Sequence, residues 1–247
     1  MLGTGCGGKK QAKVTPPPPP PMAAPSVATV PSTIPPTRPQ PEAPPRSSER
    51  KADAGSPIFI PEGTKPISVE TGKASWYGAP YHNRRSSNGE IYDMHEFTAA
   101  HRTLPLGSTV RVTNLKTGHS TVVRITDRGP FVEGRIVDLS LAAAKQADVW
   151  QAGVAPVRLE LLRTPVPLDR GGRWAVQIGS FRQEGEANTL AQQLTRRYKT
   201  AKVLRFSSPV GDWWVRVRVL QDDRKRAEEI ARDTKTSEGK VFIVRLD

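Results

Sequence analysis

The stretch VRVTNLKTGHSTVVRITDRGP, residues 110–130, decides the architecture of the first folded part of this chain. Apolar side chains alternate with polar ones on both sides of Thr117-Gly118. This alternation is the pattern of two β-strands, and the Thr-Gly pair is a turn signal between them. We therefore expect a hairpin here, with STVVRITD (120–127) as its second strand.

Further short elements surround this hairpin. Residues 140–147 (SLAAAKQA) are expected to form a helix, with the Ser140 hydroxyl as a possible cap for its first amides. Residues 157–162 (VRLELL) are expected to form a strand. Many short strands with one short helix predict a small, mainly β barrel over residues 72–163.

A different order of elements follows TPVPLDRGG (164–172), which reads as a linker because it holds two prolines and two glycines. This linker suggests free movement between the two folded parts. Over residues 173–247 the patterns predict four strands and two helices, in the order 174–181 (strand), 183–197 (helix), 201–206 (strand), 213–219 (strand), 223–233 (helix) and 241–246 (strand). This β-α-β-β-α-β order is typical of a small α+β, ferredoxin-like unit with both helices on one face of the sheet.

One face of that predicted sheet carries candidate binding residues. In WWVRVRV (213–219), successive side chains point to opposite faces. The apolar set belongs under the helices, which leaves Trp214, Arg216 and Arg218 on the open face, where Gln177 of the neighbouring strand joins them. An aromatic ring with flanking donors suits a sugar face or a nucleobase alike. The alternative is a solvated sheet with an edge tryptophan.

The N-terminal part has a composition that prevents regular structure. Seventeen of the 24 prolines lie in residues 1–71, and proline is excluded from helix interiors and central strands. We expect a disordered tether there, with polyproline helix at residues 16–21. The net charge of +13 is spread along the chain without a block of lysine and arginine. It favours a polyanionic partner, such as nucleic acid, cell-wall polymer or lipid.

The chain has one cysteine, Cys6, so neither an internal disulfide nor a thiolate metal cluster is possible. Its context, Leu2-Gly3-Thr4-Gly5-Cys6, resembles the lipobox of bacterial lipoproteins, although the leucine stands four positions before the cysteine instead of the usual three. The charged and apolar parts of a signal peptide are absent from this stretch. We expect a lipid anchor at Cys6; the alternative is an incidental cysteine.

Six motifs of the first folded part occur together in one order: GKASWYG (72–78), SSNGE (86–90), TAAHRTLPLGS (98–108), VRVTNLKTG (110–118), RITDRGPFV (124–132) and GRIVDLSLAAAKQ (134–146). In this spacing they resemble the double-psi β-barrel of the rare lipoprotein A family, which are septal lytic transglycosylases of bacterial peptidoglycan. Residues 173–247 resemble a SPOR domain, a type that generally binds glycan strands stripped of their peptides. The sequence departs from the family pattern at Asn83, at Ser86 and at residues 220–222.

The resemblance also implies a location and a set of partners. It implies an exported protein of the cell envelope, in the periplasm, enriched at the septum and held on the outer membrane by the anchor at Cys6. Peptide-stripped peptidoglycan is the expected partner, and a monomer is the expected state. No metal pattern is visible among the histidines, and no phosphate loop appears, so we expect no metal, no cofactor and no nucleic acid.

The resemblance places the candidate catalytic residues at Asp127, Glu90 and His101. A lytic transglycosylase uses no water, because the primary hydroxyl of the muramic sugar attacks its own anomeric carbon. One carboxyl group must protonate the departing oxygen, so its pKa has to be raised. We expect Asp127 to be this acid and base, Glu90 to be the second carboxylate and His101 to orient one of them by a hydrogen bond.

Three further residues are candidates for substrate binding. Trp76 and Tyr77 are expected to form a sugar-stacking wall, and Arg128 is expected to meet a lactyl carboxylate or a peptide. Asp138 is expected to be structural or capping.

Structural alternatives stand beside these roles. Asp127 is also a plausible turn residue, Glu90 an exposed hairpin residue, His101 a partner for buried backbone and Trp76 a core residue.

Two alternative functions remain open at the level of sequence. A non-catalytic glycan-binding scaffold would use the same folds, because fold does not settle function. The pair of Glu90 and Asp127 favours the enzyme, since a pure binder needs no such pair. Nucleic-acid binding by the ferredoxin-like unit is a third possibility, but the unit lacks the aromatic-rich motif of an RNA-recognition sheet.

Overall fold

The computed structural model describes residues 58–61, 63–168, 171–199, 201–236 and 239–247. Cys6 and residues 1–57 of the predicted tether lie outside the described residues. No helix of the described ranges is long and apolar enough to cross a membrane.

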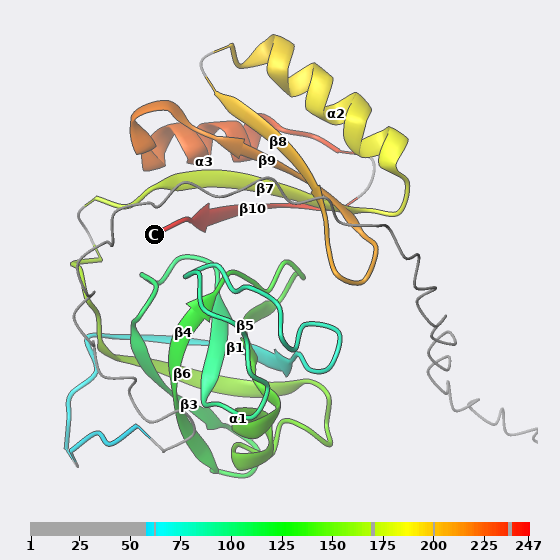
Figure 1. Ribbon diagram of the computed structural model, residues 1–247. Helices are drawn as coiled ribbons and strands as arrows, with labels where there is room; N and C mark the ends of the chain where they lie inside the picture. The colour runs from blue at the N-terminus through cyan, green and yellow to red at the C-terminus, as the bar shows by residue number, and fades with distance from the viewer. Residues whose placement is uncertain (1–57, 62, 169–170, 200, 237–238) are drawn as a thin grey trace, which may run out of the picture. The chain divides into compact units, whose positions relative to one another are not determined.

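The first folded part is a closed barrel, which confirms the predicted fold class. Its strands are joined in the order β1-β5-β2-β4-β3-β6 (Figure 1). The strands are β1 (Ser68–Trp76), β2 (Thr98–His101), β3 (Thr109–Asn114), β4 (Ser120–Asp127), β5 (Arg135–Leu139) and β6 (Ala155–Arg163). The predicted hairpin is present, because β3 and β4 pair antiparallel from Thr109–Arg124 to Thr113–Ser120.

Alternating side chains of these strands fill the barrel. Val110 and Val112 of β3 meet Val123 and Ile125 of β4 in a core where all four are fully buried. One side of the barrel is covered by helix α1 (Leu141–Gln146), whose first turn is capped as predicted: the Ser140 hydroxyl accepts a hydrogen bond from the Ala143 amide at 3.3 Å.

The barrel begins earlier than the sequence predicts. Strand β1 starts at Ser68 and pairs with β6 from Ser68–Leu161 onward, so the expectation that residues 68–71 are part of an unstructured tether is wrong. The last proline of this region is Pro66, and the amide of the next residue, Ile67, already donates to the Leu161 carbonyl at 2.7 Å. Proline therefore prevents regular secondary structure only up to residue 66, and not up to residue 71.

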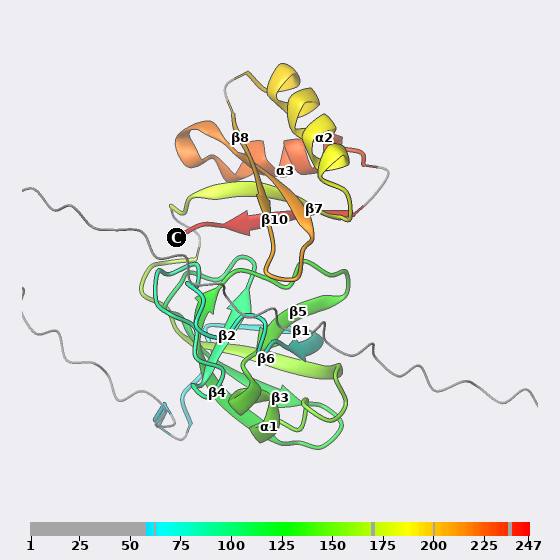
Figure 2. The same ribbon diagram turned by 45° about the vertical axis from the view of Figure 1, so that its right-hand side comes forward.

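The second folded part is a four-stranded sheet in the order β10-β7-β9-β8, with both longer helices on one face (Figures 1 and 2). Its elements are β7 (Trp174–Phe181), α2 (Glu184–Arg197), β8 (Lys202–Ser207), β9 (Trp213–Arg218), the short 3₁₀ turn η1 (Leu220–Asp222), α3 (Arg224–Asp233) and β10 (Lys240–Arg245). This confirms the predicted α+β unit. The apolar alternation of β9 works as expected, since Val215 and Val217 are fully buried with Ala187 and Ile230 of the helices.

The barrel and this sheet lie in one compact unit of the chain and contact each other directly. The Leu106 amide donates to the Asp247 carbonyl at 3.2 Å, and the Arg245 amide donates to the Arg102 carbonyl at 2.9 Å. These backbone bonds contradict the freedom that the linker suggests. They form because β10 ends beside the barrel loop that follows His101.

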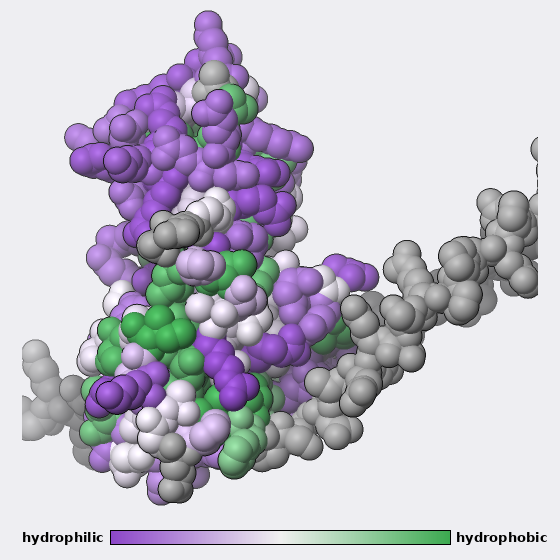
Figure 3. All heavy atoms as spheres, turned by 90° about the vertical axis from the view of Figure 1, so that its left-hand side faces the viewer, coloured by the Kyte–Doolittle hydropathy of each residue, from purple (hydrophilic) through white to green (hydrophobic). Residues whose placement is uncertain are grey.

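The sheet face opposite the helices is partly covered by the barrel. Phe131, from the loop after β4, packs against Trp214 and Phe242 with ring centroids 5.3 and 5.9 Å apart. As a result, Trp214 is 8% exposed and Gln177 is 1% exposed. The outer surface of the same unit differs between its parts: in Figure 3 the sheet-and-helix part is almost entirely hydrophilic, whereas apolar residues gather on the barrel part.

Candidate functional site

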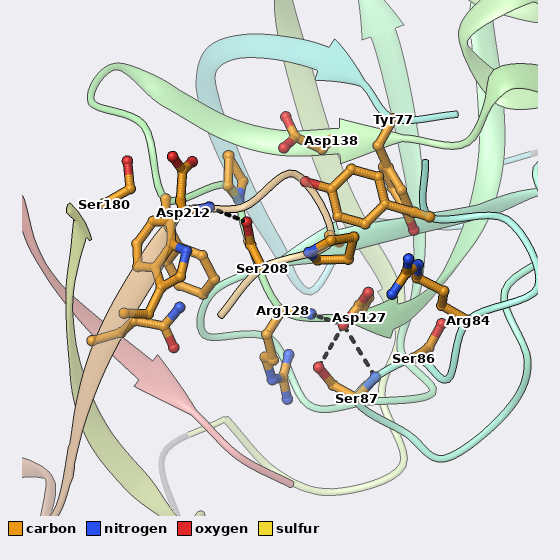
Figure 4. A pocket seen from close by; sticks show the side chains of 18 of the residues that line it. Tyr77, Arg84, Ser86, Ser87, Asp127, Arg128, Asp138, Ser180, Ser208 and Asp212 are labelled. Atoms are coloured by element: carbon orange, nitrogen blue, oxygen red, sulfur yellow. Dashed lines mark hydrogen bonds between the residues drawn. The ribbon is translucent and has the colours of Figure 1, made fainter. Parts of the chain in front are cut away.

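A cavity of about 430 Å³ lies where the barrel loops meet the sheet (Figure 4). This volume is within the usual range for small-molecule and oligosaccharide sites. Both the barrel and the sheet contribute to its lining. Its acidic residues are Asp127, Asp138 and Asp212; its arginines are Arg84, Arg85, Arg128, Arg135 and Arg216; its aromatic residues are Tyr77, Tyr81, Tyr92, Phe131, Phe206 and Trp214.

Asp127 ends strand β4 and projects into this cavity with one oxygen held and one free. Its Oδ1 accepts hydrogen bonds from the Ser87 amide at 3.1 Å, from the Ser87 hydroxyl and from the Arg128 amide at 2.7 Å (Figure 4). Within the described ranges, no hydrogen bond reaches Oδ2. The donors fix the carboxylate in one orientation and leave Oδ2 for a ligand.

Asp138 is a second carboxyl group in the same cavity, and the sequence interpretation missed its candidacy. It lies on β5, where its Oδ1 accepts from the Ser75 hydroxyl at 2.8 Å and its Oδ2 lies 3.2 Å from the Arg135 guanidinium. Burial raises the pKa of Asp138, although Arg135 and the Ser75 bond oppose this effect. The sequence did contain a signal for Asp138: it stands between Val137 and Leu139, two apolar residues of a buried strand. An acidic side chain is rarely buried without a functional or structural role.

Glu90 does not join this pair. Both of its carboxylate oxygens are bound by the Arg124 guanidinium, at 2.9 and 2.8 Å, and this bond lowers the pKa of Glu90. Glu90 is not among the residues that line the cavity. The prediction of a Glu90–Asp127 pair is therefore not supported by the geometry.

His101 orients neither predicted carboxylate, which corrects the expected role. Its Nδ1 accepts hydrogen bonds from the Thr103 amide at 3.2 Å and the Leu104 amide at 3.0 Å. The proton must therefore be on Nε2, which lies 3.3 Å from a Glu70 carboxylate oxygen. Burial lowers the pKa of His101, and the bond from His101 lowers the pKa of Glu70. The neutral ring therefore satisfies buried backbone at the end of β2.

This arrangement predicts a stability change in mildly acidic solution. Because the pKa of His101 is depressed in the folded state, the unfolded chain binds a proton first. The contribution of His101 to the free energy of unfolding is then fully present above about pH 6.5, the pKa of histidine in the unfolded chain. It is lost as pH falls through the lower pKa of the folded state, by up to about 1.4 kcal/mol per pH unit.

Chemical unfolding of the wild-type chain and of His101→Asn between pH 7 and pH 4.5 tests this. Asparagine retains an acceptor near the position of Nδ1 but does not titrate. We expect the acid-dependent loss to be smaller in the variant. Equal slopes for the two proteins would contradict a buried neutral histidine.

Arg128 lines the cavity but its guanidinium is occupied by the protein. It donates to the carbonyl oxygens of His101 at 3.0 Å and Leu104 at 2.7 Å, and to that of Asp247. The side chain is 8% exposed, and burial lowers the pKa of Arg128 to about 10. The guanidinium of Arg128 thus holds backbone carbonyls, and its contact with a substrate carboxylate stays a prediction. Its length lets it reach past the cavity wall to these three carbonyls.

Replacing Arg128 is therefore expected to destabilise the fold. Arg128→Ala leaves buried carbonyl groups without a donor, so the free energy of unfolding should fall by about 3 kcal/mol. Arg124→Ala is the matched control, because Arg124 makes a partly exposed ion pair with Glu90 that is worth about 1 kcal/mol or less. Urea unfolding measures both, and a loss for Arg128→Ala no larger than that of the control would show that its bonds are not structural.

Of the two predicted wall residues, only Tyr77 reaches the cavity. Its ring stacks on Tyr92 with centroids 4.4 Å apart and meets Tyr81 edge-on at 5.8 Å. Burial, with help from the charge of Asp127, raises the pKa of Tyr77 well above its usual value. Trp76 instead packs against the apolar barrel core and is not among the residues that line the cavity.

The sheet contributes three of its four predicted residues. Gln177, Trp214 and Arg216 line the cavity, and the Arg216 guanidinium donates to Gln177 Oε1 at 3.0 and 2.6 Å. Arg218 does not line it and instead lies 3.5 Å from Asp222. Two residues further along a strand correspond to roughly 6.6 Å, which carries Arg218 past the end of the cavity.

The residues that the structure describes contain no group of three or more His, Cys, Asp or Glu side chains that would hold a metal ion.

Comparison with known proteins agrees with this arrangement. Residues 69–159 match the model of the lytic transglycolase family, and residues 171–245 match that of the SPOR domain. The endolytic peptidoglycan transglycosylase RlpA of Vibrio cholerae serotype O1 is 50% identical over 133 residues, which are 51% of this chain and 51% of that protein. The RlpA of Neisseria meningitidis serogroup B is 39% identical over 154 residues, 62% of this chain and 64% of its own.

The chain spans about half the length of the first curated relatives that it matches. Among solved structures, the expansin of Clavibacter michiganensis aligns with 72% of this chain and 90% of its own, at 14% identity and a TM-score of 0.32; this likeness is too low to bear on the argument. The two family matches are what identify the folded parts. Residues 69–159 are thus a lytic transglycolase domain with the double-psi barrel, and residues 171–245 are a SPOR domain.

Proposed function

We propose that this chain is a lytic transglycosylase that cleaves the glycan strands of peptidoglycan and leaves anhydro-muramic ends. The observation that carries the proposal is the presence of two carboxyl groups in one cavity with different surroundings. Asp138 is buried with a raised pKa, and Asp127 is held by three donors with one oxygen free. Two carboxyl groups whose environments differ in this way are the usual basis for acid and base roles.

The proposed reaction divides the two proton transfers between these residues. Asp138 gives its proton to the glycosidic oxygen as the bond from that oxygen to the muramic anomeric carbon breaks. The primary hydroxyl of the same muramic sugar attacks the anomeric carbon, and its proton passes to Oδ2 of Asp127. The products are a new sugar hydroxyl and an intramolecular ether, with no water consumed. Exchange with solvent returns both carboxyl groups to their starting states.

Aromatic residues of the barrel support the binding of sugar rings. The Tyr77–Tyr92 stack forms an apolar surface within the cavity, and Tyr81 is packed against its edge. Rings of this kind match the apolar face of a pyranose, and the neighbouring arginines match its hydroxyls and carboxylate. The RlpA relatives, which are named as endolytic peptidoglycan transglycosylases, support the same substrate class.

The remaining functional assignments follow from this substrate. We assign catalysis to the barrel of residues 72–163, with β1 extending it to residue 68, and strand binding to residues 173–247. We place the protein in the cell envelope at the septum, as a monomer on peptide-stripped peptidoglycan, anchored to the outer membrane through Cys6.

Digestion of peptidoglycan tests the proposed activity. Intact and amidase-stripped sacculi are incubated with the full chain, and soluble products are read by mass spectrometry. Anhydro-ended fragments, 18 Da lighter than hydrolytic ones because no water has been added, support the lytic reaction. Binding to stripped sacculi without any release of fragments would instead make the chain a glycan-binding scaffold.

A further inference from the structure

The hairpin that joins β8 and β9 of the SPOR domain enters the cavity that holds the two carboxyl groups. Ser207, Ser208, Pro209 and Asp212 of this hairpin line the same space as Asp127 and Asp138, and Figure 4 shows Ser208 and Asp212 beside them. We propose that the SPOR domain forms one wall of the catalytic cavity, so that a single short stretch of glycan contacts both domains at once. This inference rests on the proposed function and concerns where the substrate binds.

The hairpin is fixed at the position where it meets the barrel. The Ser208 amide donates to the Asp212 carbonyl at 2.7 Å, and the Asp212 amide donates back to the Ser208 hydroxyl at 3.1 Å. Its charge reaches the barrel: Asp212 helps to raise the pKa of Tyr81, together with Asp138 and Asp127, after burial itself. Tyr81 of the barrel lines the same cavity as Asp212 of the SPOR domain.

Arg216 brings a cation from the SPOR sheet into the same cavity. Its guanidinium is bonded to the neutral Gln177 amide oxygen and stacked on Phe206, 4.9 Å from the ring centroid. Within the described part of the chain, no carboxylate lies within ion-pair distance of it. The charge that opposes the lowering of its pKa by burial is that of Asp127, on the barrel. Because Arg216 lines the cavity, its guanidinium is available to substrate oxygens.

Part of this SPOR face is covered by the barrel. Phe131 covers Trp214 and Phe242, and Arg102 stacks on Phe242 at 5.4 Å. At the same edge, Lys240 pairs with Glu133 at 3.0 Å. In this arrangement, a glycan that enters the cavity also contacts the SPOR face through Gln177, Trp214 and Arg216. A glycan bound by the SPOR domain is then also positioned at the carboxyl groups of Asp127 and Asp138.

A shared wall and a separate tether predict different length dependence. A tether raises the effective concentration of substrate, and it helps only when a strand is long enough to occupy both sites. A wall contributes to binding of even the shortest substrate. The comparison therefore needs a soluble peptide-free tetrasaccharide, which holds one cleavable bond, and long peptide-free strands.

Arg216→Ala in the full chain provides the test, with Arg196→Ala as control. Arg196 is an exposed arginine of α2, which packs on the other face of the sheet. We expect Arg216→Ala to lower kcat/KM by about tenfold or more on both substrates, and Arg196→Ala to change neither. A loss confined to the long strands would show a tether and overturn the proposal.

Titration calorimetry gives a readout that does not depend on cleavage. In an Asp127→Asn background, the tetrasaccharide is expected to bind once per chain. Its affinity should fall both with Tyr81→Ala on the barrel and with Arg216→Ala on the SPOR domain. Two sites per chain, each weakened by only one of these substitutions, would overturn the shared wall. An absence of anhydro products from the wild-type chain, with single-site binding intact, would count against the proposed function alone.

Discussion

Replacing Asp138 by asparagine is expected to lower the rate of anhydro-product release by about 10²–10⁴-fold, the usual contribution of a general acid. Asparagine has nearly the same size, and its oxygen still accepts the Ser75 bond, so the fold should persist. It has no proton to give to the departing oxygen. Initial rates on soluble peptide-free strands, with circular dichroism of the same samples, measure the effect.

The pH dependence separates the proposed roles of the two carboxyl groups. Activity requires protonated Asp138, so the rate of the wild type should fall as pH rises through its raised pKa. The same direction holds for stability: a raised folded pKa favours the fold below the unfolded value, and this contribution is lost as pH rises. The melting temperature of Asp138→Asn should therefore fall less than that of the wild type over this range.

Substitutions of the other two carboxylates, Asp127 and Glu90, serve as comparisons for Asp138→Asn. Asp127→Asn should also lose about 10²-fold or more, because the attacking hydroxyl loses its base. Glu90→Gln should change the rate much less, since Glu90 is bound to Arg124 and does not line the cavity. A severe loss in Glu90→Gln with near-normal activity in Asp138→Asn would reassign the second carboxylate to Glu90, as the sequence first suggested.

Gly239→Ala is expected to destabilise the SPOR domain by about 4 kcal/mol. The backbone at Gly239 is left-handed, with φ of +73°, which costs a residue with a side chain about 1–3 kcal/mol. An added Cβ would also lie 2.4 Å from the carbonyl carbon and oxygen of Gly179. Those are backbone atoms of the paired strand β7, so the contact is relieved only by separating β10 from β7, at a further cost of about 1–3 kcal/mol.

Gly211→Ala is the control for this prediction. Gly211 is also left-handed, with φ of +92°, but nothing lies within 4 Å of the position of its Cβ. Its substitution should cost about 1–2 kcal/mol from backbone strain alone. Urea unfolding of both variants measures the difference, and equal losses would show that the close approach of Gly179 and Gly239 is not a constraint.

The strands and helices were predictable because each has a local signal. The alternation of Val110, Val112, Val123 and Ile125 is a property of neighbouring residues, and it identifies a core face before any partner is known. The SPOR-type order of elements was readable for the same reason. The start of β1 was misplaced by four residues, because proline content was averaged over a region whose last proline is Pro66.

The candidate site was only partly predictable. Asp127 was chosen correctly as a cavity residue, and so were Tyr77, Gln177, Trp214 and Arg216.

Four other choices are engaged by groups of the protein itself. Glu90 is bound by Arg124, His101 by the Thr103 and Leu104 amides, and Arg128 by three carbonyls. Trp76 joins the barrel core. A motif shows which residue types are present, but competition for hydrogen-bond partners is decided in space.

The sequence by itself determined the two folds, their order and the chemical class of residues available, because these depend on local periodicity and short motifs. Only the tertiary structure decided which carboxyl groups share a cavity. Asp138 meets Asp127 because β1, β5, β2 and β4 lie side by side in the barrel, and Arg216 joins them because the SPOR sheet packs on the loop that carries Phe131. Burial and the hydrogen-bond and ion-pair partners of Asp138 then set its pKa, and neither can be read from the neighbouring residues in the chain.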